Sequence, residues 1–197
     1  MELTRCSWAN GSELEKEYQD QEWGVAVHDD KKLFEMLILE SFQAGLSWST
    51  ILKKREGFRR AFDNFEIEKI AKYDEEKIAN LMKDRSIVCN LKKIKSAVQN
   101  SKAAIKIIDE FGSLDEYFWG FVDFSQILGE YKKIEEIPSE SKISKKLSID
   151  LKKRGFAFLG PVVCYSFLQA CGLVNDHIQS CFKRQPLECG YYHSNKL

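Results

Sequence analysis

The chain has 197 residues, with 30 acidic and 30 basic residues, so its formal net charge is zero. Hydrophobic residues make up 44% and charged residues 30%, which is typical of a globular protein in water and excludes a fibrous or disordered chain. No stretch reaches the length of a membrane span, and the N-terminus lacks a signal-peptide run. We therefore expect a cytoplasmic protein without membrane contact, whose six cysteines do not form disulfides.

Apolar residues recur with helical spacing along most of the chain, and no run alternates with period two, so the sequence predicts an all-α fold. The segment 122–142 is predicted to be mainly loop, and the tail from about residue 185 to be irregular. The predicted helices cover, in chain order, about residues 31–45, 48–62, 66–72, 74–83, 90–110, 113–120, 143–153, 161–171 and 176–182.

Glu40 is the first anomaly along the chain. In a helical projection of residues 31–45 it shares one side with Leu33 and Leu37, and apolar residues cover most of the remaining surface. A carboxylate in such a buried helix costs free energy unless it is paired, protonated or used. These residues alone favour a structural acid bonded to a neighbouring helix end, with a pocket acid that faces a cationic ligand as the alternative.

Four large aromatic residues, Trp8, Tyr18, Trp23 and Trp48, fall in the first quarter of the chain. Aromatic residues are usually part of a core. Flat ring faces beside a carboxylate also suit a cationic heterocycle, through stacking and cation–π attraction. The sequence leaves both interpretations open.

Two segments near the C-terminus have spacings that suit ligands. The first runs from Arg154 to Pro161, has two glycines between two predicted helices, and suits a phosphate or a plain interhelical corner. In the second, His177 and Cys181 are four residues apart on the predicted helix 176–182, as two ligands of one zinc ion would be. A chance pair has the same spacing, and Cys6 is a candidate further ligand.

Together these features resemble DNA-3-methyladenine glycosylase I, a family of helix–hairpin–helix base-excision enzymes. The resemblance covers about residues 5–182. It rests on five blocks in the same order: Arg5-Cys6-x-Trp8, Tyr18-x-Asp20-x-Glu22-Trp23-Gly24, residues 31–56, residues 152–177, and Cys181.

The resemblance implies an all-α helix–hairpin–helix DNA glycosylase fold, with two helical lobes around a base-binding cleft. Residues 1–197 would form one domain in which the N- and C-terminal segments share a lobe. It also implies a monomer that hydrolyses the N-glycosidic bond of 3-methyladenine in double-stranded alkylated DNA, during base-excision repair, and releases free 3-methyladenine.

The resemblance also assigns roles to particular residues. Glu40 would be the catalytic glutamate that contacts the methylated base, and Trp48 would stack on that base. Trp8, Tyr18 and Trp23 would complete the substrate pocket, and the hairpin residues Gly155, Phe158 and Gly160 would bind DNA. Asn175 stands where the wider superfamily has a catalytic aspartate, and the hairpin lysine of lyase-type relatives is absent, which implies a monofunctional hydrolase that needs no cofactor for its chemical step.

The family's zinc site uses Cys, His, His and Cys, and here Cys6, His177 and Cys181 match three of these ligands. Gln19 stands at the first histidine position, and glutamine is a poor zinc ligand. Three outcomes are open: a site completed by water, a replacement ligand such as Cys189 or His193 from the tail, or the loss of zinc. We expect a weakened or tail-assisted structural zinc that takes no part in catalysis.

Two alternatives remain at this stage. The protein is a family member that binds DNA or a nucleobase without cleavage, or it is a structural helical zinc module that acts in protein interactions. The second alternative gives the aromatic residues around Glu40 no use.

Overall fold

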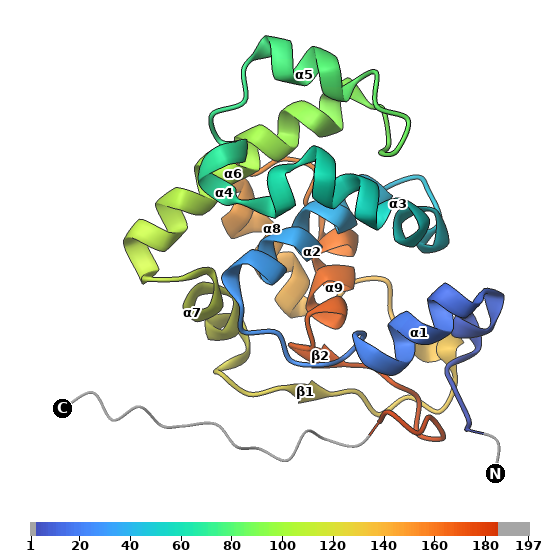
Figure 1. The fold of residues 1–197 in the computed structure, drawn as a ribbon. Helices are drawn as coiled ribbons and strands as arrows, with labels where there is room; N and C mark the ends of the chain where they lie inside the picture. Colours follow the sequence, from blue (N-terminus) through green and yellow to red (C-terminus); the bar gives the residue numbers. More distant parts are fainter. Residues whose placement is uncertain (1–2, 185–197) are drawn as a thin grey trace.

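The computed structural model describes residues 3–184 of the protein (Figure 1). Within this range the regular secondary structure is almost entirely helical, as predicted, with only two strands of two residues each. The α-helices are α1 (Glu13–Gln21), α2 (Asp30–Gln43), α3 (Trp48–Ala61), α4 (Ile67–Ile70), α5 (Glu75–Leu81), α6 (Leu91–Phe111), α7 (Leu114–Trp119), α8 (Lys142–Lys153) and α9 (Pro161–Ala170). Short 3-10 helices lie at Ser7–Gly11 (η1), Asp63–Phe65 (η2), Gly120–Val122 (η3) and Ile134–Glu136 (η4).

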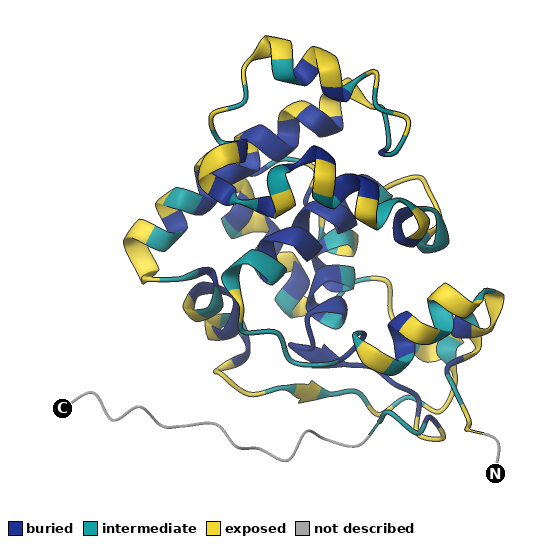
Figure 2. Ribbon diagram, viewed as in Figure 1, coloured by how far each residue is buried: buried dark blue, intermediate teal, exposed yellow. Residues whose placement is uncertain are grey.

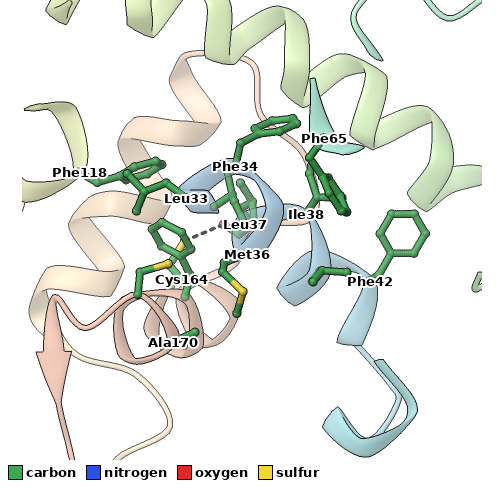
Figure 3. Close-up of a cluster of buried hydrophobic side chains, with 14 of the residues drawn as sticks. Leu33, Phe34, Met36, Leu37, Ile38, Phe42, Phe65, Phe118, Cys164 and Ala170 are labelled. Carbon is green, nitrogen blue, oxygen red and sulfur yellow. Dashed lines mark hydrogen bonds between the residues drawn. The ribbon is translucent and has the colours of Figure 1, made fainter. Parts of the chain in front are cut away.

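Helix α2 is the central element. Asp29 begins it by accepting a hydrogen bond from the backbone N–H of Lys32 at 2.8 Å. Every residue from Leu33 to Phe42 is buried (Figure 2), because α2 packs against α3, α6, α7 and α9. Figure 3 shows this core. Its side chains include Leu33, Phe34, Met36, Leu37, Ile38 and Phe42 of α2, with Phe65, Phe118, Cys164 and Ala170 around them.

Two groups of elements lie about α2 and α9, while α7 packs on α2 and α6, and α8 packs on α9. Helices α3 to α6 lie on one side, in the upper part of Figure 1, and α1 lies on the other side with the strands β1 (Ile127–Leu128) and β2 (Val174–Asn175). Helix α1 contacts α3 across the two groups. The two ends of the described chain lie together, because the backbone N–H of Phe182 donates to the carbonyl of Thr4 at 3.0 Å.

The predicted helix 176–182 is wrong. The chain instead forms the two-residue strand β2, which pairs in parallel with β1, and continues as turns. Local polar contacts hold this backbone in a non-helical path. The side chain of Asn175 accepts from the backbone N–H of His177, and the buried carboxylate of Asp176 accepts from Tyr165 and Gln169 at 2.6 and 2.7 Å.

Helix α1 was not among the predicted helices. Its sequence is strongly polar, and only Tyr18 and Gln19 within it are buried, so it gives little periodic signal. Ser12 begins the helix by accepting from the N–H of Glu15, and the acidic residues Glu13 and Glu15 occupy the first turn. None of the helices among the described residues is long and apolar enough to cross a membrane.

The C-terminal end of α2 is held by a lysine from another helix. Lys93 of α6 is only 6% exposed, and its ammonium group donates to the carbonyls of Phe42 and Ala44 at 2.7 and 2.6 Å. These carbonyls belong to the last turn of α2, where unpaired acceptors and the helix dipole both favour a cation. Burial lowers the pKa of Lys93.

We expect Lys93→Met to lower the free energy of unfolding by about 1–3 kcal/mol, because it leaves buried carbonyls without a donor. Denaturant unfolding at pH 7 measures this change. Lys92→Met is the matched control, since Lys92 is the exposed neighbour on the same helix. Equal stabilities for the two variants would contradict the role of Lys93 as the cap of α2.

Candidate active site

A cavity of about 300 Å³ is lined by residues of α1, α2, α3 and α9. This volume is at the small end of ligand-binding pockets and suits a single heterocycle. The lining residues include all five side chains that the resemblance assigns to the substrate pocket. They are Trp8, Tyr18, Trp23, Glu40, Gln43, Trp48, Ile134, Ile137, Ser166 and Gln169.

Glu40 lies in the lining of this cavity. The residue is 4% exposed, and its Oε2 atom has no hydrogen-bond partner among the described residues. Burial raises its pKa from 4.5 to about 8. The structural alternative, a bond from Glu40 to a neighbouring helix end, is therefore not seen for this oxygen, and the group is free to meet a ligand.

Two hydrogen-bond donors beside Glu40 are also buried and unpaired within the described chain. They are the hydroxyl of Tyr18 on α1 and the indole Nε1 of Trp48, the first residue of α3. Most buried polar atoms in proteins find a partner, so three unpaired ones around one cavity are unusual. Two donors and one acid in the lining of one cavity point to a ligand with polar edges, and the aromatic side chains beside them suit a flat face.

The aromatic residues line the cavity as one contacting series, in which Trp8 and Tyr18, with ring centroids 6.3 Å apart, are the middle members. Tyr18 and Trp48 have ring centroids 5.2 Å apart, tilted by 53°, and Trp8 meets Trp23 edge-on at 5.2 Å. The turn between α2 and α3 sets the place of Trp48: Gly45 adopts a φ of +83°, and Ser47 begins α3 by accepting from the N–H of Thr50.

Five lining residues were not predicted from the sequence. Gln43 is on the last turn of α2, three residues after Glu40, and this helical spacing was a usable signal. Ser166 and Gln169 of α9 share the same three-residue spacing. Ile134 and Ile137 come from the segment predicted to be loop, and nothing local in their sequence indicates that they reach the pocket.

The segment between α8 and α9 leaves Gly155, Phe158 and Gly160 exposed. Gly155 has a φ of +93°, and Phe158, which is not a glycine, has a φ of +60°. The side-chain amide of Asn100 fixes the segment: it accepts from the N–H of Ala157 at 2.8 Å and donates to the carbonyl of Ala157 at 3.1 Å. The turn is thus held rigidly with its tip in solvent.

Cys6, His177 and Cys181 come together as the sequence predicted, although not on a helix. Their ligand atoms all lie within 4.8 Å of one another, and the three residues are buried. The Nε2 atom of His177 lies 2.9 Å from the carbonyl oxygen of Trp23. That oxygen only accepts, so Nε2 carries the proton and Nδ1 turns its lone pair toward the two sulfurs, the orientation that a metal ligand requires.

The fourth corner of this cluster is taken by Gln19. Its amide Nε2 lies 3.0 Å from Sγ of Cys181 and 3.2 Å from Nδ1 of His177. The sulfurs of Cys6 and Cys181 and the imidazole of His177 are donors that fit a zinc ion. The amide NH₂ group of Gln19 does not fit one, because it has no lone pair for a metal. The proposed tail ligands Cys189 and His193 lie outside the described residues. The two sulfurs interact directly, which raises the pKa of Cys6 and lowers that of Cys181.

The raised pKa of Glu40 makes the stability of the protein depend on pH. Because the pKa is higher in the folded protein than in the unfolded chain, the ionisation of Glu40 costs no stability below about pH 4.5 and destabilises the fold progressively as the pH rises to about 8. Each unit of pKa difference corresponds to about 1.4 kcal/mol.

We therefore expect the free energy of unfolding of Glu40→Gln, relative to that of the unmodified protein, to rise between pH 5 and pH 8. Urea unfolding at several pH values measures this difference. Glu76→Gln, at an exposed position of α5, is the control and should show no such trend. A pH-independent difference for Glu40→Gln would mean that Glu40 is already ionised at pH 5.

A family model and a similar protein of known name both relate the sequence to the methyladenine glycosylases. The model of the methyladenine glycosylase family matches residues 8–184. The chain is 42% identical over 179 residues to DNA-3-methyladenine glycosylase 1 of Escherichia coli (strain K12), which covers 91% of this chain and 96% of that protein.

Solved structures agree with this result. A crystal structure of 3-methyladenine DNA glycosylase I matches with a TM-score of 0.90 and 42% identity, over 92% of this chain and all of that one. A crystal structure of a variant of 3-methyladenine DNA glycosylase I in complex with 3-methyladenine matches with a TM-score of 0.89 and 36% identity, over 92% of this chain and 97% of that one. The chain described here therefore belongs to the methyladenine glycosylase family.

Proposed function

We propose that the protein is a monofunctional DNA glycosylase that hydrolyses the N-glycosidic bond of 3-methyladenine in double-stranded alkylated DNA, as a step of base-excision repair. One observation carries the proposal: the pocket combines Oε2 of Glu40 with the donors of Tyr18 and Trp48, and none of these three atoms has a hydrogen-bond partner in the described part of the chain. Membership of the family supports it, as does the bound 3-methyladenine in a structure of a similar protein.

The pocket recognises the base through charge and shape. Methylation at N3 gives the adenine ring of the nucleotide a fixed positive charge. The ring stacks on Trp48, where cation–π attraction adds to the contact, and its exocyclic amine donates to the carboxylate of Glu40. A cation beside Glu40 favours the ionised form, so binding lowers the pKa of Glu40 from its raised value in the free protein.

The chemical step requires little proton transfer to the leaving group. The bond between C1′ of the sugar and N9 of the base breaks with its electron pair moving to the base, which neutralises the ring's charge. Water adds to the oxocarbenium-like C1′ and loses a proton to solvent, giving an abasic site and free 3-methyladenine. No lysine lines the pocket in the described part of the chain, which agrees with hydrolysis by water rather than a Schiff base.

A duplex must expose the base before the pocket can hold it. Flipping costs a few kcal/mol, and less for a damaged base pair. In the proposed complex, Gly155, Phe158 and Gly160 approach the DNA backbone, because they lie exposed beside the start of α9, where backbone N–H groups suit a phosphate.

For Glu40→Gln we expect the rate of 3-methyladenine release from alkylated DNA to fall by about 10- to 100-fold, because the variant loses a charge-assisted hydrogen bond of about 1.5–3 kcal/mol. Single-turnover release of the labelled base measures this rate, and Glu76→Gln should match the unmodified protein. An unchanged rate in Glu40→Gln would remove Glu40 from the proposed mechanism. DNA binding without base release by the unmodified protein would instead identify a non-cleaving family member.

For Trp48→Ala we expect weaker binding of free 3-methyladenine, by roughly 10- to 100-fold, because stacking on an aromatic side chain contributes about 1–3 kcal/mol per base. Calorimetric titration measures the affinity. Trp48→Phe keeps a ring at the same place and should retain most of the binding. Undiminished binding by the alanine variant would show that the base does not stack on Trp48.

A further inference from the structure

Gln19 is fully buried on α1, one residue after the pocket residue Tyr18, and its amide group faces the Cys6, His177 and Cys181 cluster. We propose that this amide replaces a metal ligand and closes a hydrogen-bonded clasp with the cluster, so that the N-terminal and C-terminal segments are joined here without a metal ion. The inference concerns the architecture of the protein and does not depend on the proposed reaction.

The donors and acceptors in this cluster match one another. The two N–H bonds of the Gln19 amide have two acceptors within reach, Sγ of Cys181 at 3.0 Å and Nδ1 of His177 at 3.2 Å. Nδ1 is available as an acceptor because the opposite ring nitrogen donates to the carbonyl of Trp23 at 2.9 Å. Cys6 lies on the other side, with its sulfur 3.6 Å from the same Nδ1.

A metal ion would have to displace this arrangement. The amide hydrogens of Gln19 point at the acceptors that an ion would need, and the amide nitrogen itself cannot bind one. Rotating the amide would present its Oε1 atom, which has no hydrogen-bond partner among the described residues. Both donors of the amide would then turn away from Cys181 and His177, and the ion would gain only a weak carboxamide ligand.

The clasp lies directly behind the aromatic wall of the pocket. The ring of His177 meets the ring of Trp23 edge-on at 4.6 Å, and Trp23 lines the cavity on its other side. Gly24 makes this approach close, because a Cβ atom there would stand 3.0 Å from the imidazole ring. The clasp therefore fixes α1 and Trp23 against the C-terminal segment, which is the structural work that a metal ion at this place would do.

The test is the metal content of the untagged, full-length protein, produced in zinc-supplemented medium and measured by plasma mass spectrometry, together with its melting temperature with and without EDTA. The proposal predicts zinc far below one ion per chain and a melting temperature that EDTA does not change. One zinc per chain, or a melting temperature lowered by EDTA, would overturn it, whichever residue supplies the fourth ligand.

Variants at Gln19 test whether this residue occupies the position of a fourth metal ligand beside Cys6, His177 and Cys181. Gln19→His restores an imidazole there and is expected to take up about one zinc per chain and to become sensitive to EDTA, as a site with four N and S ligands should. Gln19→Leu should melt at a lower temperature and remain free of metal. Gln21→His, at an exposed position of the same helix, controls for metal binding by any added histidine. A folded Gln19→His variant that binds no zinc would overturn the assignment of Gln19 to a ligand position.

Discussion

The burial of the Glu40 carboxyl group, whose Oε2 atom has no hydrogen-bond partner within residues 3–184, is the constraint on which the rest of the structure depends. A buried acid without a partner destabilises a fold, so the surrounding elements must supply compensating free energy. Helix α2 supplies it through an apolar surface that is covered nearly all round (Figure 3) and through caps at both ends, Asp29 at its start and Lys93 at its C-terminal end.

The pocket and the cluster of Cys6, His177 and Cys181 share the segment that contains Tyr18, Gln19 and Trp23. Tyr18 and Trp23 line the cavity, while Gln19 of the same segment bonds to His177 of the C-terminal segment. Because the cluster joins the N-terminal segment to the C-terminal one, the order of the pocket depends on residues far away in sequence. A hydrogen-bonded clasp would keep the pocket ordered without a metal ion. The stability of this part of the protein would then not depend on how much zinc the cell contains.

Helical periodicity was sufficient for the long helices, since α2, α3, α6, α8 and α9 each bury a broad apolar face. Helical periodicity failed where a helix has little apolar surface, and where local polar contacts determine the backbone conformation. Helix α1 is too polar to give a periodic signal, and the segment after Asn175 has helical spacing but is held in strand and turns by contacts of Asn175 and Asp176. The prediction that His177 and Cys181 lie close together therefore rested on a helix that does not form, although the two residues do lie close together.

The composition of the site was less accessible to sequence reasoning than the fold. Glu40 stood out because an acid within an apolar helix face is costly, but its free oxygen is visible only in three dimensions. The resemblance supplied the aromatic residues of the pocket. It also marked Gln19 as a departure, and only the structure shows that its amide reaches both Cys181 and His177. Ile134 and Ile137 reach the pocket through tertiary packing that no local pattern encodes.

The central claim is that Glu40 waits in the free protein as an unpaired, largely protonated acid and becomes a carboxylate when it meets the base. Carbon-13 NMR of the glutamate side-chain carboxyl groups, assigned with Glu40→Gln and recorded across pH, measures this directly. The account predicts that Glu40 titrates near pH 8 in the free protein and at a lower pH when 3-methyladenine is bound, because the exocyclic amine of the base donates to the carboxylate. A Glu40 signal that titrates near pH 4.5 in the free protein, or that does not respond to the base, would contradict it.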